Sequence, residues 1–415
     1  MEKALLKSHP YSNDGIRASV CLLLGVILLC LHASLMAGPR EQAKRIHDRL
    51  AGIPPSATVL DQMATQIAAG DVQGAAQLAM ENPAFYSVSL KNWITPWTNE
   101  EGDVFAALND YTATVIGMSR DDMDFRQILS GDILYVAKAE LNLPAYSTSN
   151  NALYQAMEDG ELDLKEVLEA TSQSQASGLP AEATAGVMTS RAAARAFFKD
   201  GTNRAMFRFT LINHMCTDLE ALKDISRTPD RIRQDVSRSP GGDSRIFLNS
   251  CVGCHAGMDP LAQAFAYYNY TYDVEQDPDG DNGTLQYLAE GQVDPQSNSR
   301  VQAKYHINSN NFPYGFITPD DSWQNYWRQG LNKNLGWDTS LSDSGKGAKS
   351  LGTELANSQA FARCQVSKVF KNVCLRVPQD SDDRSQIDAM ASNFVNSGYK
   401  IKQVFADAAD YCKGE

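Results

Sequence analysis

The sequence predicts a mainly α-helical protein with little β-structure, in which several helical units surround one short cysteine-containing segment. Two observations lead to this prediction. Apolar residues recur at spacings of three and four over most of the chain, which is the period of an amphipathic helix. Strand-like alternation is scarce, and Gly, Pro and Asp interrupt the helical runs at short intervals.

The N-terminus, residues 1–37, is typical of a signal peptide or a signal anchor. Lys3, Lys7 and Arg17 precede an apolar run of about 20 residues that ends in small residues suited to cleavage. Either outcome places the rest of the chain in the periplasm or at the exterior of the cell envelope. An uncleaved segment would also anchor it to the inner membrane, which is the only membrane association that we expect.

Residues 38–148 are predicted to form an N-terminal helical domain. Gly52 ends its first helix, and Pro54 and Pro55 break the chain before the second. The predicted helices cover residues 43–51, 58–69, 72–81, 84–94, 103–116 and 124–136.

Three further segments complete the predicted organisation. Residues 149–179 are rich in Ser, Asn, Gly and Glu and are expected to form a hinge or a helical excursion. Residues 180–272 should contain one or two buried helices at 192–222 and a polar loop at 225–243. A helix that carries the cysteine segment should follow at 249–268. Residues 273–415 begin with polar loops and are predicted to form a C-terminal helical domain with helices near 346–375 and 383–411.

The charge balance argues against nucleic acid as a partner. The chain has 37 Lys and Arg against 50 Asp and Glu, a formal net charge of −13. Phosphate binding depends on clustered basic residues that release counterions, and the sequence contains no such cluster. The acidic surface keeps the protein soluble and would also suit a basic partner protein.

Four of the eight cysteines are candidates for disulfides. Cys216, Cys364, Cys374 and Cys412 lie outside both the signal and the segment at 251–255. If one helix carries both Cys364 and Cys374, these residues are about 15 Å apart along its axis, beyond the reach of a disulfide. Two arrangements remain, 216–364 with 374–412 or 216–374 with 364–412, and free buried thiols are the third alternative.

The segment CVGCH at residues 251–255 is the strongest chemical signal in the sequence. Cys251 and Cys254 have the spacing with which two thiols add to the vinyl groups of one heme c, and His255 follows as the proximal iron ligand. The alternatives are a bare thiol-redox pair and half of a zinc site. A zinc site would need a second Cys/His cluster nearby, and none follows. Residues 180–272 are therefore predicted to be a cytochrome c-like heme-binding domain.

The residue opposite His255 on the iron is not evident from the sequence. Met258 lies on the same side of the same helix and is expected near the heme edge instead. The candidates for the distal position are His306, in an aromatic loop, and His214 or Met215, on a helix upstream. Water or an open position is the remaining alternative.

A weaker second site is the acidic loop DPDGDNG. Asp277, Asp279 and Asp281 alternate as the oxygen ligands of calcium loops do. Asn282 stands where an EF-hand has Gly, and Leu288 stands where it has Glu, so an ordinary polar turn is the alternative to a calcium site.

The chain resembles a family of large exported proteins, abundant in planctomycetes, with cytochrome c-like domains of unknown function. The resemblance rests on SCVGCHAGMDPLAQAF from Ser250, RLAGIPPSATVLDQM from Arg49, NPAFYSVSLKNW from Asn82, NRAMFRFTLINHMC from Asn203 and LANSQAFARCQVSKVF from Leu355. It implies a mainly helical fold, a redox role outside the cytoplasm and a Cys216–Cys364 disulfide. The chain departs from the family before the heme segment, at 225–242, and after it, at AYYNYTYD.

The leading functional hypothesis is electron transfer by an exported monoheme c-type cytochrome with a redox partner that the sequence does not identify. The main alternative is a heme enzyme of peroxidase or oxidase type, with an open or weakly held sixth iron position. A third hypothesis is a structural or interaction protein in which heme mainly adds stability.

Overall fold

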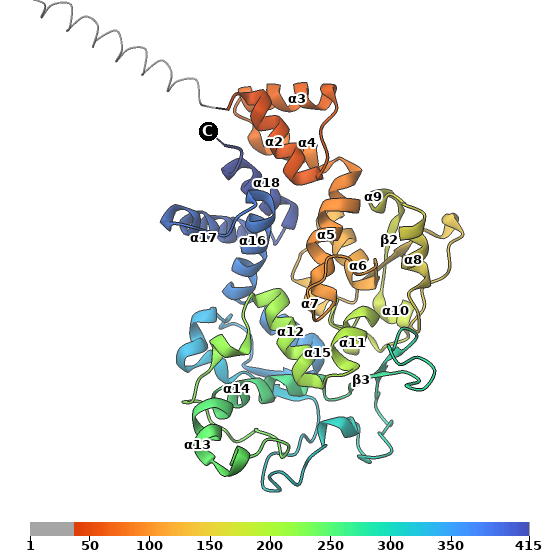
Figure 1. Cartoon of the computed structure of the whole chain (residues 1–415), viewed down its shortest axis with the longest axis vertical. Helices are drawn as coiled ribbons and strands as arrows, with labels where there is room; N and C mark the ends of the chain where they lie inside the picture. The colour runs from red at the N-terminus through yellow and green to blue at the C-terminus, as the bar shows by residue number, and fades with distance from the viewer. Residues whose placement is uncertain (1–36, 415) are drawn as a thin grey trace, which may run out of the picture.

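The computed structural model describes residues 37–414 and confirms the mainly α-helical fold (Figure 1). Nearly all of the predicted signal segment, residues 1–36, lies outside the described residues. Among residues 37–414, no helix is both long and apolar enough to cross a membrane. In Figure 1 the N-terminal and C-terminal helices lie together at one end of the molecule, and α14 (Val252–Ala262) lies toward the other.

The first three helices confirm the sequence prediction closely. They are α2 (Pro39–Ala51), α3 (Ala57–Ala68) and α4 (Val72–Met80). Gly52 ends α2 with a φ of 74°, a left-handed conformation that glycine adopts without steric cost. The Ser56 side chain accepts a backbone N–H from the first turn of α3, which fixes where that helix begins.

The chain from α4 to the first strand departs from two predicted helices. Its elements are the π-helical turn η1 (Phe85–Leu90), α5 (Lys91–Ile94), the 3₁₀ helix η2 (Thr95–Thr98), α6 (Asp110–Arg120), α7 (Gln127–Ser130) and β1 (Leu134–Ala137). The helix predicted at 103–116 starts only at residue 110, because the Asn109 side chain accepts the N–H of Thr112 as its cap. The helix predicted at 124–136 is wrong. Only one turn forms there, since residues 134–137 pair with β2 (Leu168–Thr171) as an antiparallel strand.

Residues 149–179 contain short helices, some of whose residues pack in the main core. They contain α8 (Ala152–Asp159), α9 (Leu164–Val167), β2 and α10 (Gln173–Ser177). Leu153 and Met157 of α8 are buried in the main core, and the Tyr154 hydroxyl donates to the carbonyl of Tyr135 at 2.8 Å.

The next segment contains the predicted pair of helices and the cysteine segment. Its elements are α11 (Arg191–Phe198), α12 (Asn203–Met215), α13 (Ser244–Ile246), the π-helical turn η7 (Phe247–Cys251), α14, β3 (Tyr268–Thr271) and β4 (Thr284–Tyr287). The predicted loop at 225–243 contains only the 3₁₀ turn η6 (Pro240–Gly242). Strands β3 and β4 form an antiparallel pair.

The C-terminal part consists of one further strand pair and four helices. These elements are β5 (Ser322–Gln324), β6 (Ser344–Lys346), α15 (Gly347–Ala356), α16 (Gln359–Cys374), α17 (Ser381–Asn396) and α18 (Ile401–Tyr411). Short 3₁₀ turns connect the longer elements at η3 (Ala139–Leu141), η4 (Ala181–Ala183), η5 (Leu219–Leu222), η8 (Gln263–Phe265), η9 (Ala303–Tyr305), η10 (Tyr326–Arg328) and η11 (Gly330–Leu335). The predicted helical run 346–375 breaks after α15, where the Ser358 side chain caps α16 by accepting the N–H of Phe361.

One hydrophobic core joins the units that the sequence predicts. Its buried residues run from Ala43 in α2 to Ala409 in α18. The C-terminal helices return to the N-terminal ones, since Arg45 and Arg49 donate to the carbonyls of Lys413 and Cys412, each at 2.7 Å. The boundaries at 148, 179 and 272 stay a prediction.

Two disulfides cross-link distant segments. Cys216 pairs with Cys364, with Cα atoms 5.2 Å apart, and Cys374 pairs with Cys412, with Cα atoms 5.4 Å apart. Cys364 and Cys374 both lie on α16, so their separation along one helix excludes a bond between them, as predicted. Of the two arrangements left open by the spacing, the structure has the one that the family resemblance implies.

Candidate functional site

The candidate site is the CVGCH segment at the start of α14. Cys251 is the last residue of η7, and Cys254 and His255 lie in the first turn of α14. Residues at positions i, i+3 and i+4 of a helix share one face. Both cysteines are outside the disulfides and partly buried. The segment therefore presents two thiols and one imidazole on one side of a helix.

A neighbouring side of α14 packs closely against a tryptophan. Gly257 has no side chain, and a Cβ atom there would overlap the indole of Trp327, which is fully buried. Phe207 of α12 packs on the same indole, with ring centroids 5.9 Å apart. A small apolar cluster that includes Phe247 and Val252 lies next to Cys251. Because cores pack densely, these contacts leave α14 little freedom to rotate.

The environment of Cys254 does not favour thiol-redox chemistry. Its Sγ lies 3.6 Å from the carbonyl oxygen of Leu219, to which it donates. Burial raises the pKa of the Cys254 thiol above its ordinary value, although nearby Lys223 acts in the opposite direction. Thiol–disulfide exchange requires the thiolate, which a raised pKa makes scarce at neutral pH.

His255 is held by a hydrogen bond to a carboxylate one helical turn away. Its Nδ1 lies 3.1 Å from Oδ1 of Asp259, four residues later on α14. The side chain of His255 is 21% exposed and that of Asp259 is fully buried. An ionised carboxylate only accepts, so Nδ1 carries the proton and Nε2 keeps the lone pair that a metal needs. Within residues 37–414, no hydrogen-bond partner occupies Nε2 of His255.

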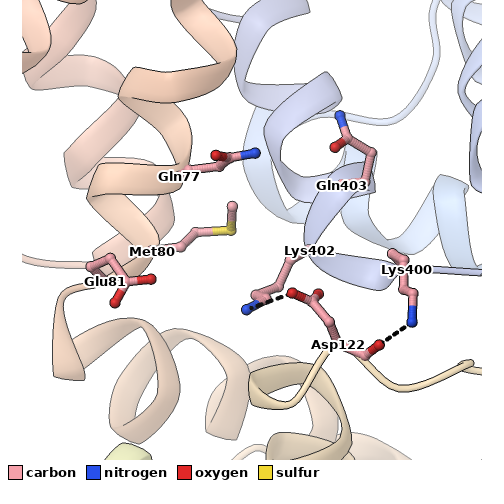
Figure 2. Close-up of a pocket in the computed structure, with 7 residues that line it drawn as sticks. All are labelled: Gln77, Met80, Glu81, Asp122, Lys400, Lys402 and Gln403. Carbon is pink, nitrogen blue, oxygen red and sulfur yellow. Dashed lines mark hydrogen bonds and ion pairs between the residues drawn. The ribbon is translucent and has the colours of Figure 1, made fainter. Parts of the chain in front are cut away.

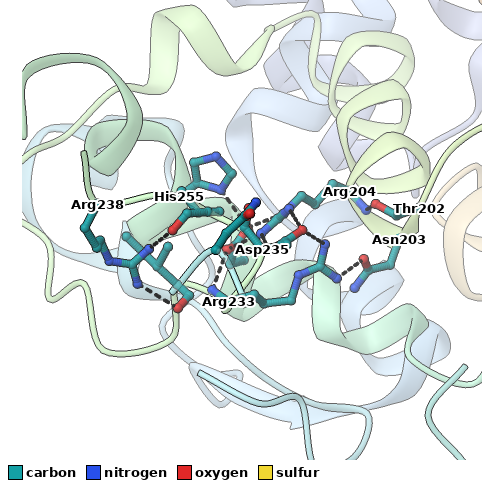
Figure 3. Close-up of polar contacts among 11 residues, drawn as sticks. Thr202, Asn203, Arg204, Arg233, Asp235, Arg238 and His255 are labelled. Atoms are coloured by element: carbon teal, nitrogen blue, oxygen red, sulfur yellow. Dashed lines mark hydrogen bonds and ion pairs between the residues drawn. The ribbon is translucent and has the colours of Figure 1, made fainter. Parts of the chain in front are cut away.

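Asp259 belongs to a largely buried network of two carboxylates and two arginines. Figure 3 labels Arg204, Arg233 and Asp235 of this network beside His255. Arg204 from α12 donates from Nε to Oδ1 of Asp259 at 2.6 Å and from a terminal nitrogen to Oδ2 at 2.7 Å. The backbone N–H of Arg233 also donates to Oδ2, at 3.2 Å. Arg204 binds Asp235 as well, at 2.7 Å and 3.1 Å. Burial alone would raise the pKa of Asp259, but the charge of Arg204 and these hydrogen bonds hold that pKa well below its ordinary value.

Exposed apolar side chains gather around the two cysteines. Ile246 and Leu248, just before Cys251, are 45% and 56% exposed. Ile225 is 68% exposed, and its Cγ2 lies 3.3 Å from where a Cβ on Gly253 would stand. Single exposed apolar residues are ordinary on protein surfaces, but a group of them beside one motif marks a surface suited to an apolar ligand.

The distal candidates named from the sequence have partners of their own. His306 Nε2 lies 3.1 Å from the carbonyl oxygen of Thr318, and Met215 Sδ accepts a hydrogen bond from the Ser358 hydroxyl at 3.4 Å. In the core, His214 Nε2 lies 2.7 Å from the Tyr111 hydroxyl. Burial, aided by the charge of Lys368, lowers the pKa of His214 well below its ordinary value. Each of these three side chains thus hydrogen-bonds to a group outside the CVGCH segment, and among residues 37–414 Nδ1 of His214 has no hydrogen-bond partner.

Met258 and the aspartates of the acidic loop make contacts of their own. Met258 is 5% exposed and belongs to the main hydrophobic core. In the loop, the Asp277 carboxylate accepts the backbone N–H groups of Asp281 and Asn282 at 2.9 Å and 2.7 Å. The Asp281 carboxylate pairs with Arg195.

Asp279, the third predicted calcium ligand, uses its carbonyl to accept from Lys199 at 3.3 Å. Over residues 37–414, no three His, Cys, Asp or Glu side chains converge on a point that could hold a metal ion, and this includes the predicted calcium loop. The carboxylates of Asp277 and Asp281 serve as turn and ion-pair groups instead.

A separate pocket of about 370 Å³ opens between α4 and α18, at the far end of the molecule from α14 (Figure 2). The two lysines that line this pocket already have partners in Asp122. Lys402 Nζ lies 3.0 Å from a carboxylate oxygen of Asp122, and Lys400 donates to the carbonyl of the same residue. No chemistry follows from this arrangement.

The network around Asp259 was not predicted. Asp259 itself was within reach of the sequence, because a carboxylate four residues after a histidine on one helix lies beside it. Arg204 and Asp235 lie 55 and 24 residues before Asp259 in the chain, and no local pattern connects them to it.

Comparisons with family models, with curated proteins and with solved structures find no match to this chain. The family resemblance read from the sequence therefore stays a prediction.

Proposed function

We propose that this chain is an exported monoheme c-type cytochrome that transfers single electrons outside the cytoplasm. Cys251 and Cys254 would hold the heme through thioether bonds, and Nε2 of His255 would bind its iron. When bound, heme iron supplies a one-electron couple between its ferric and ferrous states. The observation that carries the proposal is the pairing of two thiols outside any disulfide with an imidazole whose Nδ1 is occupied and whose Nε2 is open.

The surroundings fit a large apolar group beside α14. Ile225, Ile246 and Leu248 expose apolar surface next to the cysteines, and heme is itself mostly apolar. The two disulfides elsewhere in the chain are compatible with export to an oxidising compartment, where heme c is attached. We therefore place the protein in the periplasm or at the cell-envelope exterior, with a redox partner protein of unknown identity.

A heme stain after denaturing electrophoresis tests the proposal. The full chain, expressed for export together with a cytochrome c maturation system, should show a covalent heme band. Replacing Cys251 and Cys254 together by Ser should abolish the band. As a matched control, replacing Cys374 and Cys412 together by Ser removes two cysteines outside the motif and should leave the band in place. No band from the wild-type chain, under conditions where a reference cytochrome matures, would refute the proposal.

One observation favours a second candidate function, a heme enzyme with an open sixth iron position. Each of His306, His214 and Met215 already has a hydrogen-bond partner outside the CVGCH segment, and His214 and Met215 are buried. The absorption spectrum of the ferric protein separates the two functions. A high-spin form that binds cyanide favours the enzyme. A low-spin form that does not bind cyanide favours the electron carrier. If the spectrum is low-spin, alanine is substituted singly for His306, His214 and Met215. Loss of the low-spin spectrum in only one of these variants would identify the distal ligand.

A further inference from the structure

We infer that Asp259 is a positioning residue that fixes the orientation of His255 and lowers the reduction potential of a heme bound there. This inference rests on the proposed function and extends it from His255, the iron ligand, to Asp259, which hydrogen-bonds to that ligand. A metal-bound histidine commonly donates its second ring N–H to a carboxylate, carbonyl or water, which sets the ring orientation and the basicity of the ligand.

The geometry makes Asp259 the stronger kind of acceptor. Its Oδ1 lies 3.1 Å from Nδ1 of His255, and its side chain has no exposed surface. A charged acceptor in a water-excluded site makes a stronger hydrogen bond than a neutral carbonyl does. The imidazole therefore becomes a more basic ligand, and a more basic ligand stabilises the ferric state relative to the ferrous state.

The network keeps the carboxylate from turning away. Both oxygens of Asp259 accept from Arg204, and Oδ2 also accepts the backbone N–H of Arg233. These donors come from α12 and from the loop before α13, so two separate parts of the fold hold one side chain. His255 is thus oriented by a group that is itself held on its other side.

Asp235 provides a matched control within the same network. It has the same side chain as Asp259, and it also pairs with Arg204 and with Arg233. The hydrogen bonds and ion pairs of its side chain do not include His255, and that side chain keeps 14% exposure. If only the total charge of the network mattered, the two aspartates would have similar effects on the heme. If the hydrogen bond to Nδ1 matters, only Asp259 will have a large effect.

The test is a potentiometric titration of the covalent heme protein, with dithionite and soluble mediators supplying the electron. Asp259→Asn should raise the midpoint potential enough to shift the reduction equilibrium at least tenfold, which is about 59 mV for a one-electron couple. Asp235→Asn should shift it much less. Equal shifts in the two variants, or no shift in Asp259→Asn while heme stays attached, would overturn the inference. Absence of covalent heme from the wild-type chain would instead refute the proposed function.

If Asp259→Asn does not fold, the wild-type holoprotein still provides a test. With ¹⁵N-labelled histidine, the ring N–H of His255 should exchange slowly with solvent, because a buried carboxylate accepts it. Exchange as fast as that of an exposed imidazole would overturn the inference.

Discussion

Replacing Arg204 by Met removes the cation that neutralises two carboxylates, and the expected cost is large because one of them is fully buried. The side chains of Arg204 and Asp259 are 17% and 0% exposed. Removing one partner of such a pair leaves an uncompensated buried charge, which typically destabilises a protein by about 3–5 kcal/mol. Met has nearly the helix propensity of Arg, so the change at α12 acts through the lost charge and hydrogen bonds.

Arg208 on the same helix provides the control for this prediction. It also binds an aspartate through two nitrogens, with Nε and a terminal nitrogen 2.8 Å and 2.6 Å from the carboxylate oxygens of Asp218. This pair is 44% and 39% exposed, so solvent screens it and Arg208→Met should cost only about 0–1 kcal/mol. Urea unfolding followed by far-ultraviolet circular dichroism measures both losses. A loss in Arg208→Met as large as that in Arg204→Met would refute the reasoning from burial.

Three further predictions concern packing, cross-linking and pH. Gly257→Ala should destabilise the fold by about 1–3 kcal/mol, measured by urea unfolding, because a Cβ there overlaps the buried indole beneath α14. Replacing Cys374 and Cys412 together by Ser opens a disulfide loop whose ends are 38 residues apart in the sequence. The greater entropy of the unfolded chain should lower the free energy of unfolding by about 4 kcal/mol, measured as a lower urea midpoint without reductant. Hydrogen bonds from Arg376 hold the pKa of Asp383 well below its ordinary value. The ionised Asp383 therefore stabilises the fold at neutral pH, and this stabilisation is lost as the pH falls below about 4. Asp383→Asn should therefore be less stable at pH 7 and lose less on acidification, as followed by thermal unfolding at several pH values.

Each of these three expectations has a distinct contrary outcome. An unchanged urea midpoint in Gly257→Ala would mean that the indole moves aside at little cost. Equal midpoints with and without the 374–412 disulfide would mean that the cross-link does not restrict the unfolded chain. Parallel stability curves for wild type and Asp383→Asn between pH 7 and the acid range would mean that this carboxylate ionises alike in the folded and unfolded states.

The N-terminal helices were predictable because their limits depend on neighbouring residues. Gly52 ends α2 and Ser56 starts α3 through contacts within a few positions of the chain. The helix predicted at 124–136 failed for the opposite reason. Residues 134–137 become a strand only because a partner strand more than 30 residues later pairs with them, and periodicity contains no information about that partner.

The sequence by itself determined the mainly α-helical fold and the CVGCH segment, since both are written in residues close together in the chain. It also limited the disulfides to two arrangements through spacing on one helix. Only the tertiary structure decided between those arrangements and brought Arg204 and Asp235 to Asp259 behind His255. The physical reason is that a buried charge needs partners on all sides, and a single helix can supply only one side.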